Sequence, residues 1–315
     1  MFRAEILLFF LAMTFSCEDT GRAILSNSSG KINDISVVIS DELWQGNVGE
    51  AIKKSFARPV YGLPQIEPVF SLRQIPTKVF SDFATKSRTI LKVDLSEKAG
   101  IYNLKNVYAT PQRVVQIKGR NSQEIIQIIN NNLNEIYSSL YFSEIREKQR
   151  RISKSLNKTQ IIKNTIGIKL NFPTSYRIAK SDTNFVWIRR DIKSGSVNLF
   201  ISKFIDKSNR PIIKIRDSIA SRNIPGPTEN TYMSTDLIYK PNTEKVYIGS
   251  KKFFETRGLW EIKDEFMAGP FLNYYHELDS IKSKFLMIDG FVFSPGSKKR
   301  DYIFELEAII RSIEY

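Results

Sequence analysis

NSQEIIQIINNNLNEIYSSLYFSEIREKQRRISKSL, residues 121–156, is the longest helix that the sequence predicts, and it divides the chain into two parts. Asn121 can cap its first turn, with Glu124 at the third helical position, as in a capping box. Apolar residues recur at steps of three and four, namely Ile125, Ile129, Leu133, Ile136 and Leu140. One face of this helix is therefore expected to be buried.

The far end of the same helix is strongly basic. Its cations are Arg146, Lys148, Arg150, Arg151 and Lys154, opposed by few carboxylates. We interpret this segment as the hinge region between two lobes. Two readings of its charge stay open: it is the solvated end of a long helix, or it contacts anionic lipid, lipopolysaccharide phosphate or an acidic protein face.

On each side of this hinge the sequence alternates between extended and helical patterns. We expect an N-terminal lobe at residues 34–160, with strands such as DISVVIS (34–40) and RTILKVDL (88–95) and a helix over 42–56. The C-terminal lobe, residues 161–315, contains successive strands and a closing amphipathic helix that places Ile303, Leu306, Ile310 and Ile313 on one side. The prediction is an α+β protein of two lobes, each a largely antiparallel sheet with packed helices.

Composition narrows the function classes. The 315 residues include 47 Lys and Arg against 33 Asp and Glu, a net charge of +14 that suits anionic partners. Nucleic acid is disfavoured because the basic residues lack interleaved aromatic side chains for stacking. A single Cys and a single His exclude an internal disulfide and argue against a zinc or haem site, so we expect no metal and no cofactor.

Catalytic motifs are missing from the sequence. His276 has no second His at the H-E-x-x-H spacing, and no P-loop, G-x-S-x-G or G-x-G-x-x-G pattern occurs. We therefore predict no catalytic residue and no identifiable small-molecule ligand, and we interpret His276 as structural. Acidic pairs such as Asp264 and Glu265 leave a hydrolase of envelope glycans or lipids as the alternative.

The N-terminus has the order of charge, apolar run and small residue that is typical of a secretory signal peptide. Arg3 precedes the apolar run 6–13, which is too short to cross a bilayer, and Ser16 precedes the only cysteine, Cys17. This boundary resembles the lipobox of bacterial lipoproteins, although Thr14 and Phe15 depart from its usual residues. The resemblance implies a signal peptide at 1–16, lipid on Cys17 and a flexible tether at 17–33; the alternative is an ordinary secretory signal that leaves a free thiol.

Three further segments carry a family resemblance: residues 59–70 (PVYGLPQIEPVF), 257–271 (RGLWEIKDEFMAGPF) and 289–310 (DGFVFSPGSKKRDYIFELEAII). They are similar to an uncharacterised bacterial cell-envelope lipoprotein family, a domain of unknown function of the DUF4837 type. The order of elements across residues 166–315 also resembles the sandwich of the extrinsic photosystem-II subunits. The family resemblance implies a lipid-anchored protein with no established activity and no catalytic residues to transfer.

Two segments are candidate contacts for a partner. Trp260, Phe266 and Phe271 surround two glycines and predict either a core hairpin or, if exposed together, an aromatic partner patch. The loop VYGLPQIEP (60–68) is either a brace or a docking edge. The expected function is a binding or accessory subunit, lipid-anchored to the bacterial outer membrane and in contact with an outer-membrane or periplasmic protein.

Overall fold

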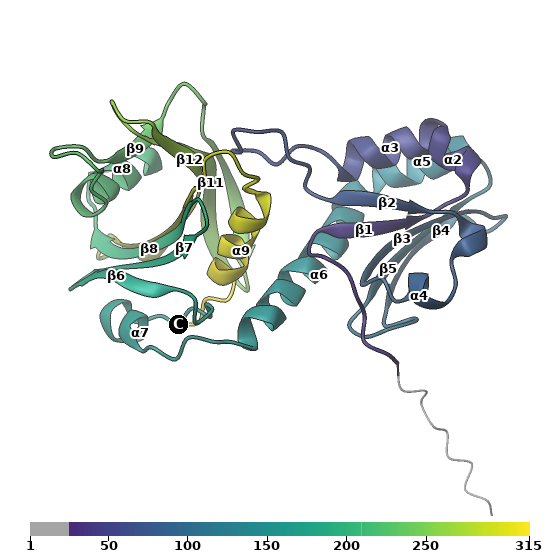
Figure 1. Ribbon diagram of the computed structural model, residues 1–315, viewed down its shortest axis with the longest axis horizontal. Coiled ribbons are helices and arrows are strands. Elements are labelled where there is room, and N and C mark those ends of the chain that lie inside the picture. The colour runs from purple at the N-terminus through teal and green to yellow at the C-terminus, as the bar shows by residue number, and fades with distance from the viewer. Residues whose placement is uncertain (1–24, 209) are drawn as a thin grey trace, which may run out of the picture.

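The computed structural model describes residues 25–208 and 210–315. Two β-sheets lie on opposite sides of the long helix α6 (Leu133–Ser153), and helices pack on each sheet (Figure 1). This arrangement confirms the predicted α+β class. Cys17 and the predicted signal peptide lie outside the described residues.

The N-terminal sheet has the strand order β2-β1-β3-β5-β4. Its strands are β1 (Asp34–Val38), β2 (Ser71–Ile75), β3 (Thr89–Leu95), β4 (Gly100–Lys105) and β5 (Arg113–Gly119). Its helices are α2 (Asp41–Gln45), α3 (Asn47–Phe56), α4 (Asp82–Thr85) and α5 (Ser122–Asn131), with a 3-10 turn η2 (Thr77–Val79). Helices α3, α5 and α6 cover one face and enclose an apolar core with it.

The expected antiparallel sheet is wrong for this lobe. Strand β1 pairs in parallel with β2 and β3, and β3 pairs in parallel with β5, whereas β4 and β5 are antiparallel. The reason is that helical connections follow β1 and β2. Each connection returns the chain to the end of the sheet at which the previous strand began, as parallel pairing requires. The short link between β3 and β4 reverses the chain instead.

The predicted helix of residues 121–156 is two helices, α5 and α6, which meet at Asn132. The side-chain amide of Asn132 donates to the carbonyl of Ile128 at 2.8 Å, a local bond that competes with helix continuation. The predicted cap is confirmed, because Asn121 accepts a 2.9 Å hydrogen bond from the amide of Glu124. The predicted apolar stripe is also buried, with Ile125, Ile129, Ile136 and Leu140 fully enclosed and Leu133 partly so.

The C-terminal sheet is antiparallel throughout its described pairs, as predicted. Its order is β10-β11-β12-β13-β8-β7-β6, and β9 also pairs with β11. The strands are β6 (Arg177–Asp182), β7 (Phe185–Ile192), β8 (Gly195–Ile205), β9 (Met233–Asp236), β10 (Asn242–Ile248), β11 (Lys251–Ile262), β12 (Met267–Asp279) and β13 (Lys284–Phe293). The helices are α7 (Ile161–Ile166), α8 (Ile212–Asn223) and α9 (Arg300–Ile310).

Two apolar clusters sit on the two faces of this curved sheet. Helices α7 and α9 cover one face together with residues of α6, and α8 covers the other (Figure 1). The predicted buried side of α9 is confirmed, because Ile303, Leu306 and Ile310 are enclosed and Ile313 packs against the same cluster. Helix α9 also packs on α6, so it joins the two lobes.

The last part of the predicted flexible tether is not free. The amide of Ser28 donates to the carbonyl of Thr110 at 3.0 Å and that of Ser29 to the carbonyl of Lys86 at 2.8 Å, and the amide of Arg88 returns a bond to Ser29. Residues 26–33 are therefore attached to the N-terminal lobe, because their backbone groups find partners at the exposed ends of β3 and β5. Across the described part of the chain, no helix combines the length and the apolar character that a membrane span needs.

Candidate functional site

The main cavity of interest lies between the two lobes and has a volume of about 580 Å³. Helices α6 and α9, strands β10 and β11 and the loop before β2 line it. Its aromatic lining residues are Tyr61, Tyr137, Tyr141, Phe142 and Phe304. Its charged lining residues are Arg58, Glu244, Glu255, Arg257, Arg300, Glu307 and Arg311. Ligand sites in proteins commonly have volumes in this range.

An ionic network centred on the buried carboxylate of Glu307 forms the inner wall of this cavity. The carboxylate of Glu307 accepts 2.7 Å hydrogen bonds from Arg257 and Arg311. Glu255 accepts a 2.6 Å bond from Arg257 and pairs with Arg311 at 3.6 Å. The hydroxyl of Tyr141, from α6, donates to Glu307. Two carboxylates and two guanidiniums thus neutralise one another. Tyr141 adds a contact from α6 to this network.

The pKa values of Glu307, Arg257 and the Tyr141 hydroxyl are shifted away from neutrality. Burial alone would raise the pKa of Glu307, but the charges of Arg257 and Arg311 outweigh it and hold that pKa at about 2. Burial opposes ionisation of Arg257, yet the neighbouring carboxylates raise its pKa well above the usual value. Burial and the charge of Glu307 raise the pKa of the Tyr141 hydroxyl. These groups keep one protonation state around pH 7, which suits binding better than proton transfer.

One cation of the cavity has a different environment. The guanidinium of Arg58 lies 4.4 Å from the ring centre of Tyr137, a cation–π contact. Within the described residues Arg58 forms no ion pair, so its charge is available to a ligand in the cavity. The stacked rings of Tyr137 and Tyr141 continue this wall, with centres 5.3 Å apart.

The loop of residues 60–68 is a brace between the lobes. Glu67 is buried and accepts hydrogen bonds from the backbone amides of Lys299 (2.7 Å) and Arg300 (3.1 Å), at the start of α9. A carboxylate is favourable there because it satisfies free amides and faces the positive end of the helix dipole. Tyr61 donates to the carbonyl of Lys240, next to β10.

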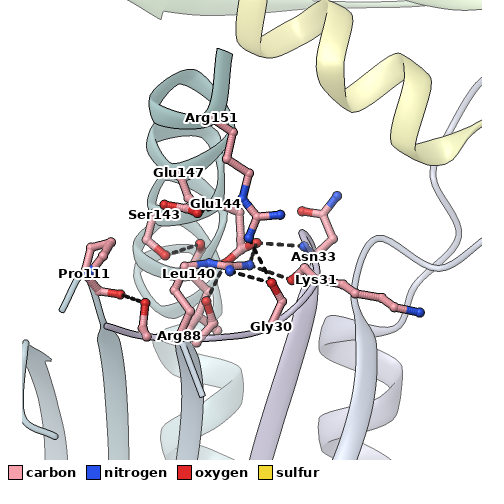
Figure 2. Close-up of polar contacts among 12 residues, drawn as sticks. Gly30, Lys31, Asn33, Arg88, Pro111, Leu140, Ser143, Glu144, Glu147 and Arg151 are labelled. Carbon is pink, nitrogen blue, oxygen red and sulfur yellow. Dashed lines mark hydrogen bonds and ion pairs between the residues drawn. The ribbon is translucent and has the colours of Figure 1, made fainter. Parts of the chain in front are cut away.

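A second polar cluster attaches residues 30–33 to the rest of the N-terminal lobe (Figure 2). The guanidinium of Arg88 donates to the carbonyl of Gly30 at 2.8 Å and to that of Lys31, and it pairs with Glu144 of α6 at 2.8 Å. Glu144 has no exposed surface and also accepts from the amide of Asn33 at 2.7 Å. The pair therefore joins residues 30–33 to the strand and helix of the N-terminal lobe.

Most cations of the predicted basic contact form ion pairs with carboxylates of the same chain. Lys148 pairs with Glu305 of α9 at 2.6 Å, and Arg150 and Arg151 both pair with Glu147 at 2.7 Å. Among the described residues, Arg146 and Lys154 form no ion pair, and both are exposed. The five cations therefore do not form one open patch, because successive turns of α6 place three of them beside carboxylates.

The predicted aromatic patch is wrong. Trp260 and Phe271 are buried in the core beneath α8, where the indole of Trp260 donates to the carbonyl of Val292 at 3.2 Å. Phe266 is fully exposed in the turn between β11 and β12. The core-hairpin interpretation holds, because alternate residues of paired strands point to the covered face.

His276 has a structural environment. Its ring stacks on Phe253 with centres 4.6 Å apart, and Nδ1 lies 2.7 Å from the carbonyl oxygen of Lys252. Within the described residues, no group of three or more His, Cys, Asp or Glu side chains is arranged to hold a metal ion.

The sequence reasoning missed the inter-lobe network. Its signal is a pair of carboxylates, Glu305 and Glu307, within the apolar stretch of α9. Helix α9 packs on α6 and on the C-terminal sheet, so a carboxylate on it needs a cation as a partner in the interior. Residue spacing on one helix does not identify that partner.

Comparisons with known proteins concern family rather than activity. A family model described as Domain of unknown function (DUF4837) matches residues 155–312, and one described as Domain of unknown function (DUF8532) matches residues 28–153. The DUF4837 resemblance predicted from the sequence is confirmed, although the segment 59–70 falls within the second match. No curated protein matches the chain.

Solved structures give low similarity. The chain is similar to a mutant of the protein Mog1 with a TM-score of 0.29 and 10% identity, over 47% of this chain and 89% of that one. It is similar to the human StAR-related lipid transfer protein 5 with a TM-score of 0.19 and 7% identity, over 54% of this chain and 98% of that one. Scores this low carry no argument, and the likeness to the photosystem-II subunits stays a prediction.

Proposed function

The chain belongs to the family described as Domain of unknown function (DUF4837), and from this premise we propose that it is an exported protein, anchored by lipid on Cys17 to the bacterial outer membrane, that acts by binding. The binding site is the cavity between the lobes, and its occupant is a ligand or an accessory partner in the envelope. The observation that carries the binding role is the guanidinium of Arg58, which makes no ion pair within the described residues and lies on the aromatic wall of Tyr137 and Tyr141.

Binding is favoured over hydrolysis by the state of Glu307 and Tyr141. A glycoside or ester hydrolase needs an acid or base that exchanges a proton near neutral pH. In the cavity, the pKa of Glu307 lies at about 2 and that of the Tyr141 hydroxyl is raised by burial. The aromatic walls and the cation of Arg58 instead suit a ligand with a flat or anionic group.

The anchoring half of the proposal is supported by the order of residues around Cys17. Several acyl chains hold a protein firmly to a bilayer, because each buried CH₂ contributes about 0.8 kcal/mol. Cells grown with a tagged fatty acid should label the wild-type chain and not Cys17→Ala. Equal labelling of the two proteins would contradict lipid attachment at this thiol.

The binding half can be tested with a photoreactive residue in the cavity. Replacing Phe142 with p-benzoylphenylalanine places the probe in the lining, and replacing the exposed Phe83 of α4 gives a matched control outside it. Irradiation of native membranes should give an adduct at position 142 that is absent at position 83 and weaker in an Arg58→Ala background. Identical adducts at both positions, or none at position 142, would contradict a ligand between the lobes.

A further inference from the structure

A second, smaller cavity beside the attached N-terminal segment is strongly basic. It has a volume of about 280 Å³ and lies between α6 and the chain around β4 and β5. Five cations and one carboxylate, Glu147, are among its lining residues. The cations are Arg88, Lys105, Arg113, Arg146 and Arg150.

Ion pairs divide these cations into two groups. Arg88 is paired with Glu144, and Arg150 is paired with Glu147, which is also bound by Arg151. In contrast, Lys105, Arg113 and Arg146 make no ion pair with any carboxylate in residues 25–208 and 210–315. Three positive charges thus line one cavity without an ion-pair partner among the described residues.

Arg113 carries the clearest sign of a missing partner. Its Nε is buried and has no hydrogen-bond acceptor among the described residues. Burial and the positive charge of Arg146 both lower the pKa of this guanidinium, which nevertheless stays charged at neutral pH. A buried charge without a counter-charge is costly, and an anion bound in the cavity would offset the charge of this guanidinium.

The cavity also lies where the proposed anchor enters the fold. Ser28 donates through its hydroxyl to the carbonyl of Pro111, which is itself a lining residue, and Ser26 accepts from the amide of Thr110. Cys17 precedes Ser26 by nine residues, and nine residues of any conformation span at most about 30 Å. A lipid on Cys17 would therefore keep this cavity close to the head groups of the bilayer.

We propose that Lys105, Arg113 and Arg146 form a phosphate site that takes the head group of an anionic phospholipid, so that the N-terminal lobe makes a second contact with the membrane that holds its anchor. The location rests on the proposed anchoring, but the site itself does not need the acyl chains. Guanidinium and ammonium groups are the usual ligands of phosphate oxygens. Anionic surfaces attract basic residues within about one Debye length.

The test uses the full chain carrying Cys17→Ala, so that no acyl chain contributes. Its affinity is measured for vesicles of phosphatidylglycerol and of phosphatidylcholine, and the ratio of the two removes any contribution of the apolar N-terminus. This Cys17→Ala parent should prefer phosphatidylglycerol. In the double variant Lys105→Gln, Arg146→Gln that preference should fall about 30-fold, since each basic residue near an anionic surface contributes roughly 1 kcal/mol.

The matched control is the double variant Lys54→Gln, Lys98→Gln, which removes the same charge. Both lysines are exposed and lie in α3 and in the link between β3 and β4. This control should retain the preference within about threefold, and all variants should keep the thermal midpoint of the parent. Equal losses in the two double variants, or no preference in the parent, would overturn the site.

A third arm separates the lipid from free phosphate. Inorganic phosphate is titrated into the same chain at constant ionic strength without vesicles. Weak binding, together with the vesicle preference described above, supports a head-group site. Binding of inorganic phosphate that depends on Lys105 and Arg146, with an unchanged vesicle ratio, would overturn the lipid assignment. If fatty-acid labelling of Cys17 failed, all three measurements could still be interpreted, because they use a chain without lipid.

Discussion

Glu67 accepts a 2.7 Å hydrogen bond from the backbone amide of Lys299, 232 residues later in the sequence. A buried carboxylate of the N-terminal lobe thus caps α9, a helix that packs on the sheet of the C-terminal lobe. The guanidinium of Arg300 reinforces the contact by donating to the carbonyl of Pro68 and the hydroxyl of Ser71. These contacts fix the lobes around the cavity, so the proposed ligand site depends on them.

Removing this cap should weaken the junction between the lobes. We expect Glu67→Ala to lower the free energy of unfolding by about 2 kcal/mol, because two amides at the start of α9 lose a charged acceptor. Urea unfolding at neutral pH measures the change. Glu229→Ala, at an exposed position, is the control and should lie within about 0.5 kcal/mol of the parent. An unchanged midpoint for Glu67→Ala would contradict the role of the cap.

A glycine in the same loop allows a close approach between the lobes. Gly62 has φ +85°, and an added Cβ would lie 3.2 Å from the amide nitrogen of Gly258 and 3.3 Å from Cβ of Arg257, both in β11. Gly249 also has a positive φ, +58°, but an added Cβ would meet nothing within 4 Å.

The two glycines therefore form a matched pair. Each substitution to Ala should cost about 1 kcal/mol for the backbone conformation, and Gly62→Ala should cost about 1 kcal/mol more for the crowding. Chemical denaturation of both variants measures the difference. If Gly62→Ala were no more destabilising than Gly249→Ala, the loop would not be tightly seated on β11.

Stability should depend on pH through Glu307. Its pKa in the folded state is about 2 against 4.5 for the free side chain. Because the folded value is the lower one, the stabilisation is complete above pH 4.5 and is lost as the pH falls toward 2. In Glu307→Gln the buried guanidiniums lose a counter-charge, so we expect a loss of about 3 kcal/mol at pH 7. Unfolding free energies at several pH values should show that the gap between parent and variant shrinks below pH 4.5.

The attachment of the N-terminal segment should depend on Arg88. In Arg88→Gln, the carbonyl of Lys31 loses its donor, that of Gly30 keeps only Arg151, and Glu144 is left buried without its cation. Hydrogen exchange at the amides of Ser28 and Ser29 should become at least about tenfold faster. Arg177→Gln removes an exposed pair with Asp191 and should leave these amides unchanged. Equal protection in Arg88→Gln would mean that backbone bonds alone hold the segment.

Sequence periodicity predicted the features that are determined by residue spacing within one helix. The Asn121 cap, the buried stripe of α5 and α6 and the buried side of α9 follow from spacing on one helix. Strand direction in the first lobe did not follow, because pairing is decided by crossover connections rather than by the strands themselves. The break at Asn132, where the side-chain amide bonds to the carbonyl of Ile128, interrupts a pattern that spacing alone extends across both helices.

The two cavities could not be predicted because their residues come from distant segments. Tyr141, Arg257 and Glu307 meet only after α6 and α9 have packed. Likewise, Arg146 was identified within a run of cations on one helix, but its unpaired neighbours Lys105 and Arg113 come from β4 and β5. Charge composition indicated an anionic partner, whereas ion pairing decided which cations are available.

The most direct test of the account is the intact mass of the chain isolated from native membranes. We predict a protein that begins at Cys17 and carries the added mass of its acyl groups. An unmodified sulfur at Cys17, or a chain that retains residues 1–16, would contradict the proposed anchoring.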